Sequence, residues 1–120
     1  MAAADCLVRV RSILKHRDRW NQGTAARNFN GEPCSPDSEQ ATRFSLLGAI
    51  DYVATVNGDQ LSRSETVVIV GSVLAKRMGF SLPPPERGIG AALDLISAFT
   101  EVAEHSDVLQ LVDIAIRSQE

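Results

Sequence analysis

The sequence has little of several residue types that define whole classes of protein. Aromatic residues make up 5% of its 120 residues, and there are only two cysteines and two histidines. A core with so few aromatic rings must be built from leucine, isoleucine, valine and alanine, which suits packed helices better than a β-sandwich. Cys6 and Cys34 have no paired spacing with each other or with the histidines. We therefore expect no metal site and two free thiols in a reducing cytosol.

A long apolar run and a large net charge are also missing. No apolar run approaches the roughly 18 residues that a membrane-spanning helix needs. The first residues, Met-Ala-Ala-Ala, lack the basic start and the apolar stretch of an export signal. The net charge of −3 argues against bulk attraction to nucleic acid or anionic lipid. These absences predict a cytoplasmic protein with no nucleic-acid partner and no membrane partner.

The charges that are present are unevenly spread along the chain. Residues 1–20 contain more basic than acidic side chains, whereas residues 94–113 contain acidic side chains and no lysine or arginine. We expect these two segments to attract each other, either within one chain or between two copies. The basic residues are Arg9, Arg11, Lys15, Arg17 and Arg19, and the acidic ones are Asp94, Glu101, Glu104, Asp107 and Asp113.

The spacing of the apolar residues predicts an all-α, bundle-like fold of about five helices in a single domain over residues 1–120. One small β-hairpin or ordered loop is expected at residues 24–34. A short polyproline connector is expected at residues 81–86. The helices are expected at residues 4–19, 37–56, 63–78 and 88–104, and Ser106 is the expected cap of the last helix.

The predicted helix at residues 37–56 has apolar positions nearly all the way round, which is typical of a central helix. Its start is predicted from Ser35 followed by Pro36, or from Asp37 with Gln40 three residues later. Gly48 in its middle costs roughly 1 kcal/mol relative to alanine. We therefore expect Gly48 to mark a place where two helices cross closely.

The segment at residues 63–78 admits two interpretations. Thr66–Val70 is a β-branched run that would suit a buried strand, and a strand followed by Gly71 would suggest a dinucleotide-binding fold. That fold needs three glycines at set spacing, and only Gly71 is present, so no cofactor is expected. Ser62 and Glu65 form a capping box, and the apolar residues recur at helical spacing. A helix is therefore favoured.

The hairpin is predicted from the turn dipeptide Asn30-Gly31. We expect residues 24–29 to run outward and residues 32–34 to run back. A two-stranded ribbon is not stable alone, so it should lie on the helices. Trp20 and Phe29 are the expected anchors.

The segment from Trp20 to Ala49 is the most unusual part of the sequence, and it supplies the candidate ligand-binding residues. A polar residue inside an apolar helix needs a partner, and an arginine there must pair or reach solvent. In one interpretation Arg43 and Ser45 tie down the hairpin. In the other, the polar residues line a pocket beside Trp20. The candidates are Trp20, Gln22, Arg27, Asn28, Arg43 and Ser45.

No catalytic residue is predicted. Nucleophilic catalysis needs a thiol or hydroxyl within hydrogen-bond reach of a base. Cys34 and His16 are the one pair that the chain could bring together, across the loop after the first helix. No local signature supports that pair, so a structural cysteine is expected.

The same segment resembles a known family. The chain reads Trp20-x-Gln22-Gly23, then Ala26-Arg27-Asn28-x-x-Gly31-x-x-Cys34, then Ala41-x-x-Phe44-Ser45-Leu46-Leu47-Gly48-Ala49-Ile50. These motifs resemble a family of small bacterial and phage proteins known only as a domain of unknown function. Its members show a tryptophan–glycine start, a turn with aspartate and glycine, and a helix that reads aromatic-Cys-x-x-Gly-Ala. Here Ser45 stands where cysteine is common. The resemblance implies no activity, only that the segment is one unit.

The functional expectation is a non-enzymatic protein-interaction or regulatory module that acts as a small helical homodimer. Two helices apolar nearly all round need more cover than their neighbours supply, and uncovered apolar patches mark interfaces. The competing expectation is a small-molecule or enzymatic site within residues 20–45. Apolar positions outside the stripes of the last two helices also suggest an interface, namely Val102, Leu109, Ile114 and Ile116.

Overall fold

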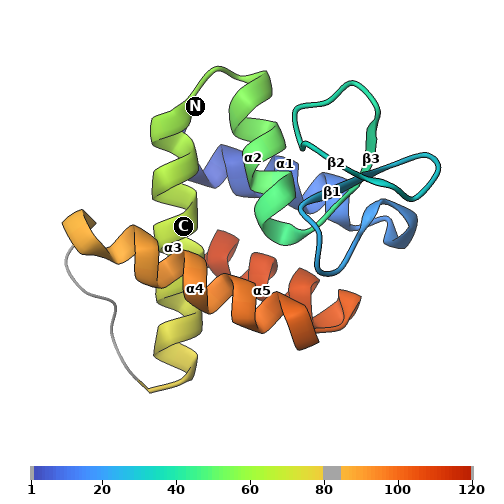
Figure 1. Ribbon diagram of the computed structural model, residues 1–120. Coiled ribbons are helices and arrows are strands. Elements are labelled where there is room, and N and C mark those ends of the chain that lie inside the picture. Colours follow the sequence, from blue (N-terminus) through green and yellow to red (C-terminus); the bar gives the residue numbers. More distant parts are fainter. Residues whose placement is uncertain (1, 80–84, 120) are drawn as a thin grey trace.

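In the part of the chain that the computed structural model describes, residues 2–79 and 85–119, five helices pack with one small antiparallel sheet (Figure 1). The prediction of a mostly helical protein is confirmed. Most of the predicted polyproline connector lies outside the described residues. The elements are α1 (Ala3–Leu14), η1 (Arg17–Arg19, a 3-10 turn), β1 (Ala26–Asn28), β2 (Pro33–Cys34), β3 (Ala41–Phe44), α2 (Leu46–Val56), α3 (Gln60–Arg77), α4 (Pro85–Val102) and α5 (His105–Arg117).

Helix α3 is at the centre of the helical body and packs against α1, α2, α4 and α5. The β-branched run Thr66–Val70 is therefore helical, as the capping and spacing signals predicted. Val67, Val70 and Leu74 recur at helical spacing on the buried side. Since that spacing places them on one face of a helix, burial of the face offsets the weak helix propensity of valine.

Helix α1 buries the face that its sequence predicted. Its buried side chains include Cys6, Leu7, Val10 and Leu14, and they pack against α2, α3 and α5. The helix ends at Leu14 rather than at residue 19, and Arg17–Arg19 form a separate 3-10 turn with no buried side chain. The difference arises because no apolar residue after Leu14 continues the buried face.

The charged segments at the two ends of the chain meet within one molecule. Arg11 on α1 forms an ion pair with Asp113 on α5, with 2.8 Å between Nε and Oδ1. Helix α5 begins at His105, and its N-cap is Glu104 instead of the predicted Ser106. The Asp107 carboxylate accepts a hydrogen bond from the Glu104 backbone N–H at 3.0 Å and so supports the start of α5.

The predicted hairpin is present, and a third strand extends it. Strand β1 pairs antiparallel with β2, with Ala26 opposite Cys34, and on its other side with β3, with Ala26 opposite Phe44. The Asn28 side chain closes the turn because its Oδ1 accepts hydrogen bonds from the N–H groups of Asn30 and Glu32. Trp20 packs on α5, but the prediction that Phe29 anchors the hairpin is wrong. Its side chain is 92% exposed.

The helix predicted over residues 37–56 begins later than expected. Ala41–Phe44 form β3, and α2 starts at Leu46. Neither predicted cap starts a helix, since residues 35–40 form turns, and the Ser35 hydroxyl donates to the Asp37 carboxylate. The helix starts late because the backbone of Ser45 is still extended (ψ 174°), and Ser45 is the N-cap of α2. Its Oγ accepts from the Gly48 N–H at 3.1 Å and caps α2.

Gly48 does mark a close approach, but the neighbour is a loop and not a helix. A Cβ atom at Gly48 would lie 1.8 Å from the carbonyl oxygen of Ala25. That carbonyl accepts a hydrogen bond from the Ser45 N–H at 3.0 Å. The absence of a side chain at Gly48 therefore lets the first turn of α2 press against the residue that precedes β1.

The N-cap of helix α3 lies three residues before the predicted one. The N-cap is Asp59 instead of Ser62, and its Oδ1 accepts from the Ser62 N–H at 3.0 Å. Ser62 itself is buried within the first turn. The hydrogen bond from the Ser62 backbone lowers the pKa of the Asp59 carboxyl, because it stabilises the charged form.

Replacing Asp59 with alanine is expected to lower the melting temperature at neutral pH, because the first turn of α3 loses its cap. A carboxyl whose pKa is lowered by folding adds stability above its unfolded pKa, and that stability is lost as pH falls through the folded pKa. The difference between the wild type and Asp59→Ala should therefore shrink in acid, as thermal unfolding followed from neutral pH down to pH 2 would show. Asp59→Asn keeps an uncharged acceptor and should retain more stability than Asp59→Ala in acid. A constant difference at every pH would contradict the capping role of the charge.

Candidate functional site

Trp20 joins the segment before the sheet to the start of α5. Its ring lies 5.4 Å from the His105 ring, centroid to centroid. The His105 ring Nε2 donates to the Leu14 carbonyl at the end of α1, which fixes the orientation of the imidazole. Trp20 also forms an isolated parallel bridge with Phe44. The half-buried indole therefore lies where α1, β3 and α5 come together.

Gln22 ties the same segment to the end of α4. Its Nε2 donates to three backbone carbonyls, those of Thr100 at 3.2 Å, Glu101 at 3.0 Å and Ala103 at 2.9 Å. The last carbonyls of a helix have no partner within the helix. One side-chain amide therefore satisfies acceptors at the α4–α5 corner.

Arg27 and Asn28 hold the hairpin in shape. The Arg27 guanidinium donates to Asn21 Oδ1 and to the Gly31 carbonyl, each at 2.8 Å. A third bond joins it to Thr24 Oγ1 at 3.3 Å. A planar guanidinium that spans several acceptors restrains their relative positions. The loop before β1 and the turn after it are thus braced by one side chain.

Arg43 is exposed, as Gln22 is, but it differs from the other candidates because it lines a hollow. This hollow of about 370 Å³ lies between η1 and β3, and we call it the β3 hollow. Arg19, whose guanidinium carbon lies 6.0 Å from the centroid of the Phe44 ring, lines it too. The full lining is Asp18, Arg19, Phe29, Ala41, Thr42 and Arg43.

The structure gives the six candidates three kinds of surroundings. Trp20 packs on His105. The polar groups of Gln22, Arg27, Asn28 and Ser45 bond to backbone or to neighbouring side chains. The hairpin is braced by Arg27 and Asn28, whereas Arg43 and Ser45 were the residues expected to tie it down. Arg43 remains open to a ligand in the β3 hollow. Ligand binding by these residues stays a prediction.

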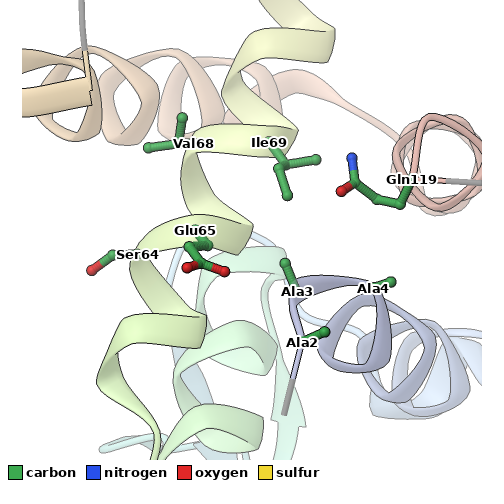
Figure 2. A pocket seen from close by; sticks show the side chains of 8 residues that line it. All are labelled: Ala2, Ala3, Ala4, Ser64, Glu65, Val68, Ile69 and Gln119. Carbon is green, nitrogen blue, oxygen red and sulfur yellow. The ribbon is translucent and has the colours of Figure 1, made fainter.

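A second hollow, of about 600 Å³, was missed by sequence reasoning (Figure 2). Its walls come from the start of α1, the middle of α3 and Gln119 just after the end of α5, and Glu65 is the one charged side chain among its lining residues. These residues are far apart in the sequence, so no local pattern could reveal the site. The lining is Ala2, Ala3, Ala4, Ser64, Glu65, Val68, Ile69 and Gln119.

The two thiols have different environments. Cys6 is fully buried and Cys34 half-buried, and neither forms a disulfide. Burial raises the pKa of the Cys6 thiol. Among the hydrogen bonds of the described residues, none joins Cys34 to His16. The geometry therefore gives no support to a catalytic thiol.

We expect Cys34 to react with a thiol reagent in the folded protein and Cys6 to react only on unfolding. The thiolate is the reactive form, and a buried thiol with a raised pKa supplies little of it near neutral pH. Labelling kinetics with a chromogenic disulfide should show one fast thiol, which Cys34→Ser removes. Cys6→Ser should remove the slow thiol instead. Rapid labelling of Cys6 in the native protein would contradict the buried placement.

Neither a metal centre nor a membrane span is found in the described residues. No group of three or more histidine, cysteine, aspartate or glutamate side chains is placed to hold a metal ion in residues 2–79 and 85–119. Over the same residues, no helix combines the length and the hydropathy that crossing a bilayer requires. The predicted cytoplasmic location stays a prediction.

The fold and the braced segment define a small helical protein with a three-stranded insert between α1 and α2. The chain belongs to the family of unknown function DUF6197, whose model matches residues 1–118. The family resemblance inferred from the motifs of residues 20–50 is thereby confirmed, and it extends over nearly the whole chain. No significant match was found among curated proteins or among solved structures.

Proposed function

We propose that the protein is a non-enzymatic interaction module that acts as a homo-oligomer, with a homodimer as its simplest form. The observation that supports this most is the exposure of Phe29. The ring stands at the tip of a hairpin whose shape is held by Arg27 and Asn28. Aromatic side chains on preorganised supports are the usual anchors of protein interfaces. A ring that is this exposed contributes nothing to the packing of the monomer.

The apolar residues outside the helical stripes support the proposal only in part. Leu109 and Ile116 pack against the core of their own chain. Val102, at the end of α4, is 81% exposed. The large exposed apolar residues are spread over several elements of the fold, which fits a contact between two folded subunits better than an obligate, core-like interface. They are Val8, Phe29, Val56, Leu61, Met78 and Val102.

Sedimentation velocity over the micromolar range tests the proposal. We expect a species of twice the 13.0 kDa chain mass to increase with concentration. A matched pair of variants identifies the surface, because Phe29 and Val56 are both large, apolar and exposed but lie on different elements. Phe29→Asp should abolish the dimer and Val56→Asp should leave it intact. A monomer at every concentration and salt level would refute self-association.

Small-molecule binding is the second proposal, and the β3 hollow is its support. Its two arginines, Arg19 and Arg43, suit an anionic ligand, since a guanidinium can bind a carboxylate or phosphate through two hydrogen bonds. Thermal shift assays with small carboxylates and phosphates would test it. A stabilisation that disappears in Arg43→Gln, but persists in Arg77→Gln, would favour this function over self-association.

A further inference from the structure

We infer that the homodimer of the proposed function forms when the basic surface around Phe29 on one copy binds the acidic α4–α5 corner of a second copy. The basic surface consists of Arg19, Phe29 and Arg43, which line the β3 hollow. The acidic corner consists of Glu101, Val102, Glu104 and Asp107. The inference rests on the proposed function and adds to it the two surfaces that meet.

The basic surface has charges that form no ion pair within the described residues, although the Arg19 guanidinium carbon lies 6.0 Å from the centroid of the Phe44 ring. In the part of the chain that the structure describes, the ion pairs join Arg11 to Asp113 and Arg63 to Asp51. Neither involves Arg19 or Arg43. One carboxylate, Asp18, shares the lining of the β3 hollow, and it is outnumbered by the basic side chains around it. The surface therefore favours an anionic partner.

The acidic corner has the complementary composition. Glu101, Glu104 and Asp107 are exposed, and no lysine or arginine lies between residues 88 and 116. Val102 lies among these carboxylates and is 81% exposed. Each surface thus presents one exposed apolar side chain within a group of charges, and the charges have opposite signs.

The ion pair between the two ends of the chain involves other residues than these two surfaces. The attraction between the basic start and the acidic end of the sequence is satisfied in the monomer between α1 and α5, through Arg11 and Asp113. The basic side chains of η1 and β3 and the carboxylates of the acidic corner take no part in that ion pair. A second copy of this chain offers both surfaces at equal concentration.

The two surfaces lie at the same end of the molecule. Arg19 ends η1 directly before Trp20, whose ring packs on His105 at the start of α5. Gln22 bonds to the Glu101 carbonyl at 3.0 Å. Figure 1 shows the hairpin and the α4–α5 corner together on the right of the view. A two-fold axis near residues 20–22 would therefore place the basic surface of each copy against the acidic corner of the other copy. Every contact of the dimer would then occur twice.

The roles of the two kinds of contact differ. Charge pairs at the rim of an interface set the orientation and the rate of association more than the affinity. The apolar side chains Phe29 and Val102 lose their exposure to water and supply the affinity. Reversal of a rim charge should thus weaken the dimer without unfolding the monomer.

Charge reversal with restoration tests the inference in the full chain by sedimentation velocity. We expect Arg43→Glu and Glu101→Lys each to raise the dimer dissociation constant at least tenfold, since each change affects both contacts of the dimer. The double variant should return to within threefold of the wild type, because opposite charges meet again. Matched controls are Lys76→Glu and Asp94→Lys, which reverse exposed charges on α3 and on an earlier turn of α4 and should leave the constant unchanged.

The outcomes separate this inference from the proposed function. A wild type that stays monomeric refutes both. A wild-type dimer that is equally sensitive to the control reversals, or that the double variant fails to restore, refutes the pairing of these two surfaces and leaves self-association intact. Circular dichroism of each variant shows that the monomer fold is retained. Phe29→Ser removes the ring without adding a charge, so loss of the dimer in this variant gives a second measurement that is independent of charge.

Discussion

Replacement of Gly48 with alanine is expected to lower the free energy of unfolding by about 3 kcal/mol or more, at or above the upper end of typical overpacking costs. The added Cβ would lie 1.8 Å from the Ala25 oxygen and 2.7 Å from its carbonyl carbon. Both are backbone atoms, which cannot rotate away as a side chain can. Ala25 is further held by its hydrogen bond from Ser45, so relief of the clash must break the cap of α2 or displace the sheet.

Gly90 provides the matched control for this prediction. It lies within α4, and a Cβ there would meet nothing within 4 Å. Gly90→Ala should therefore stabilise the protein by about 0.5–1 kcal/mol through helix propensity alone. Thermal unfolding should show Gly48→Ala melting roughly 10 °C or more below the wild type. Equal melting temperatures for Gly48→Ala and the wild type would mean that α2 does not press on Ala25.

Replacement of Phe44 with alanine is expected to cost about 3–5 kcal/mol, the range for deletion of a buried phenylalanine ring. Phe44 is 1% exposed, and its ring lies 5.0 Å from that of Tyr52, centroid to centroid. It belongs to β3 and also faces the core between the sheet and the helices. Loss of the ring would leave a cavity at the junction that holds the sheet on the helical body.

Phe29→Ala is the control, because it removes the same ring from a site that is almost fully exposed. Its effect on unfolding should stay within about 0.5 kcal/mol, as for surface substitutions in general. Chemical denaturation of the two variants would give the comparison. Similar destabilisation by both changes would contradict the opposite placement of the two rings. The prediction holds for the monomer, so it is measured at a concentration at which sedimentation shows a single chain mass.

Helical segments with regular apolar spacing could be predicted from the sequence because a helix depends mainly on residues that are close together in the chain. The buried face of α1 and the helix through Thr66–Val70 follow from apolar residues that recur every three or four positions. The hairpin follows from Asn30-Gly31, since few dipeptides adopt such a turn easily. In these segments the local preferences and the tertiary contacts favour the same structure.

The strand β3 could not be predicted in the same way. Ala41 and Phe44 are three residues apart, which continues the helical spacing of the residues that follow. The pairing of β3 with β1 depends on a contact between Arg43 and Arg27 across the sheet, which no window of sequence contains. Ser45 was therefore interpreted as a polar residue inside a helix, whereas it is the residue that ends the strand and caps α2.

The candidate site was limited by the same dependence on distant contacts. Gln22 is a candidate ligand-binding residue in the sequence, but the partners of its side chain in the structure lie 78 to 81 residues further along the chain. The sequence also gave no sign that the Phe29 ring is exposed. Burial of an aromatic residue is the general expectation, and only the course of the hairpin places this ring in solvent.

The contacts between α1 and α5 have a consequence for the synthesis of the protein on the ribosome. Arg11 bonds to a residue 102 positions later, and the Leu14 carbonyl accepts from a side chain 91 positions later. At about 5–20 residues per second, translation of that interval takes roughly 5–20 s. During this time the apolar face of α1 has no α5 to cover it, so the nascent chain depends on α2 and α3, or on a chaperone, to keep that face from aggregation.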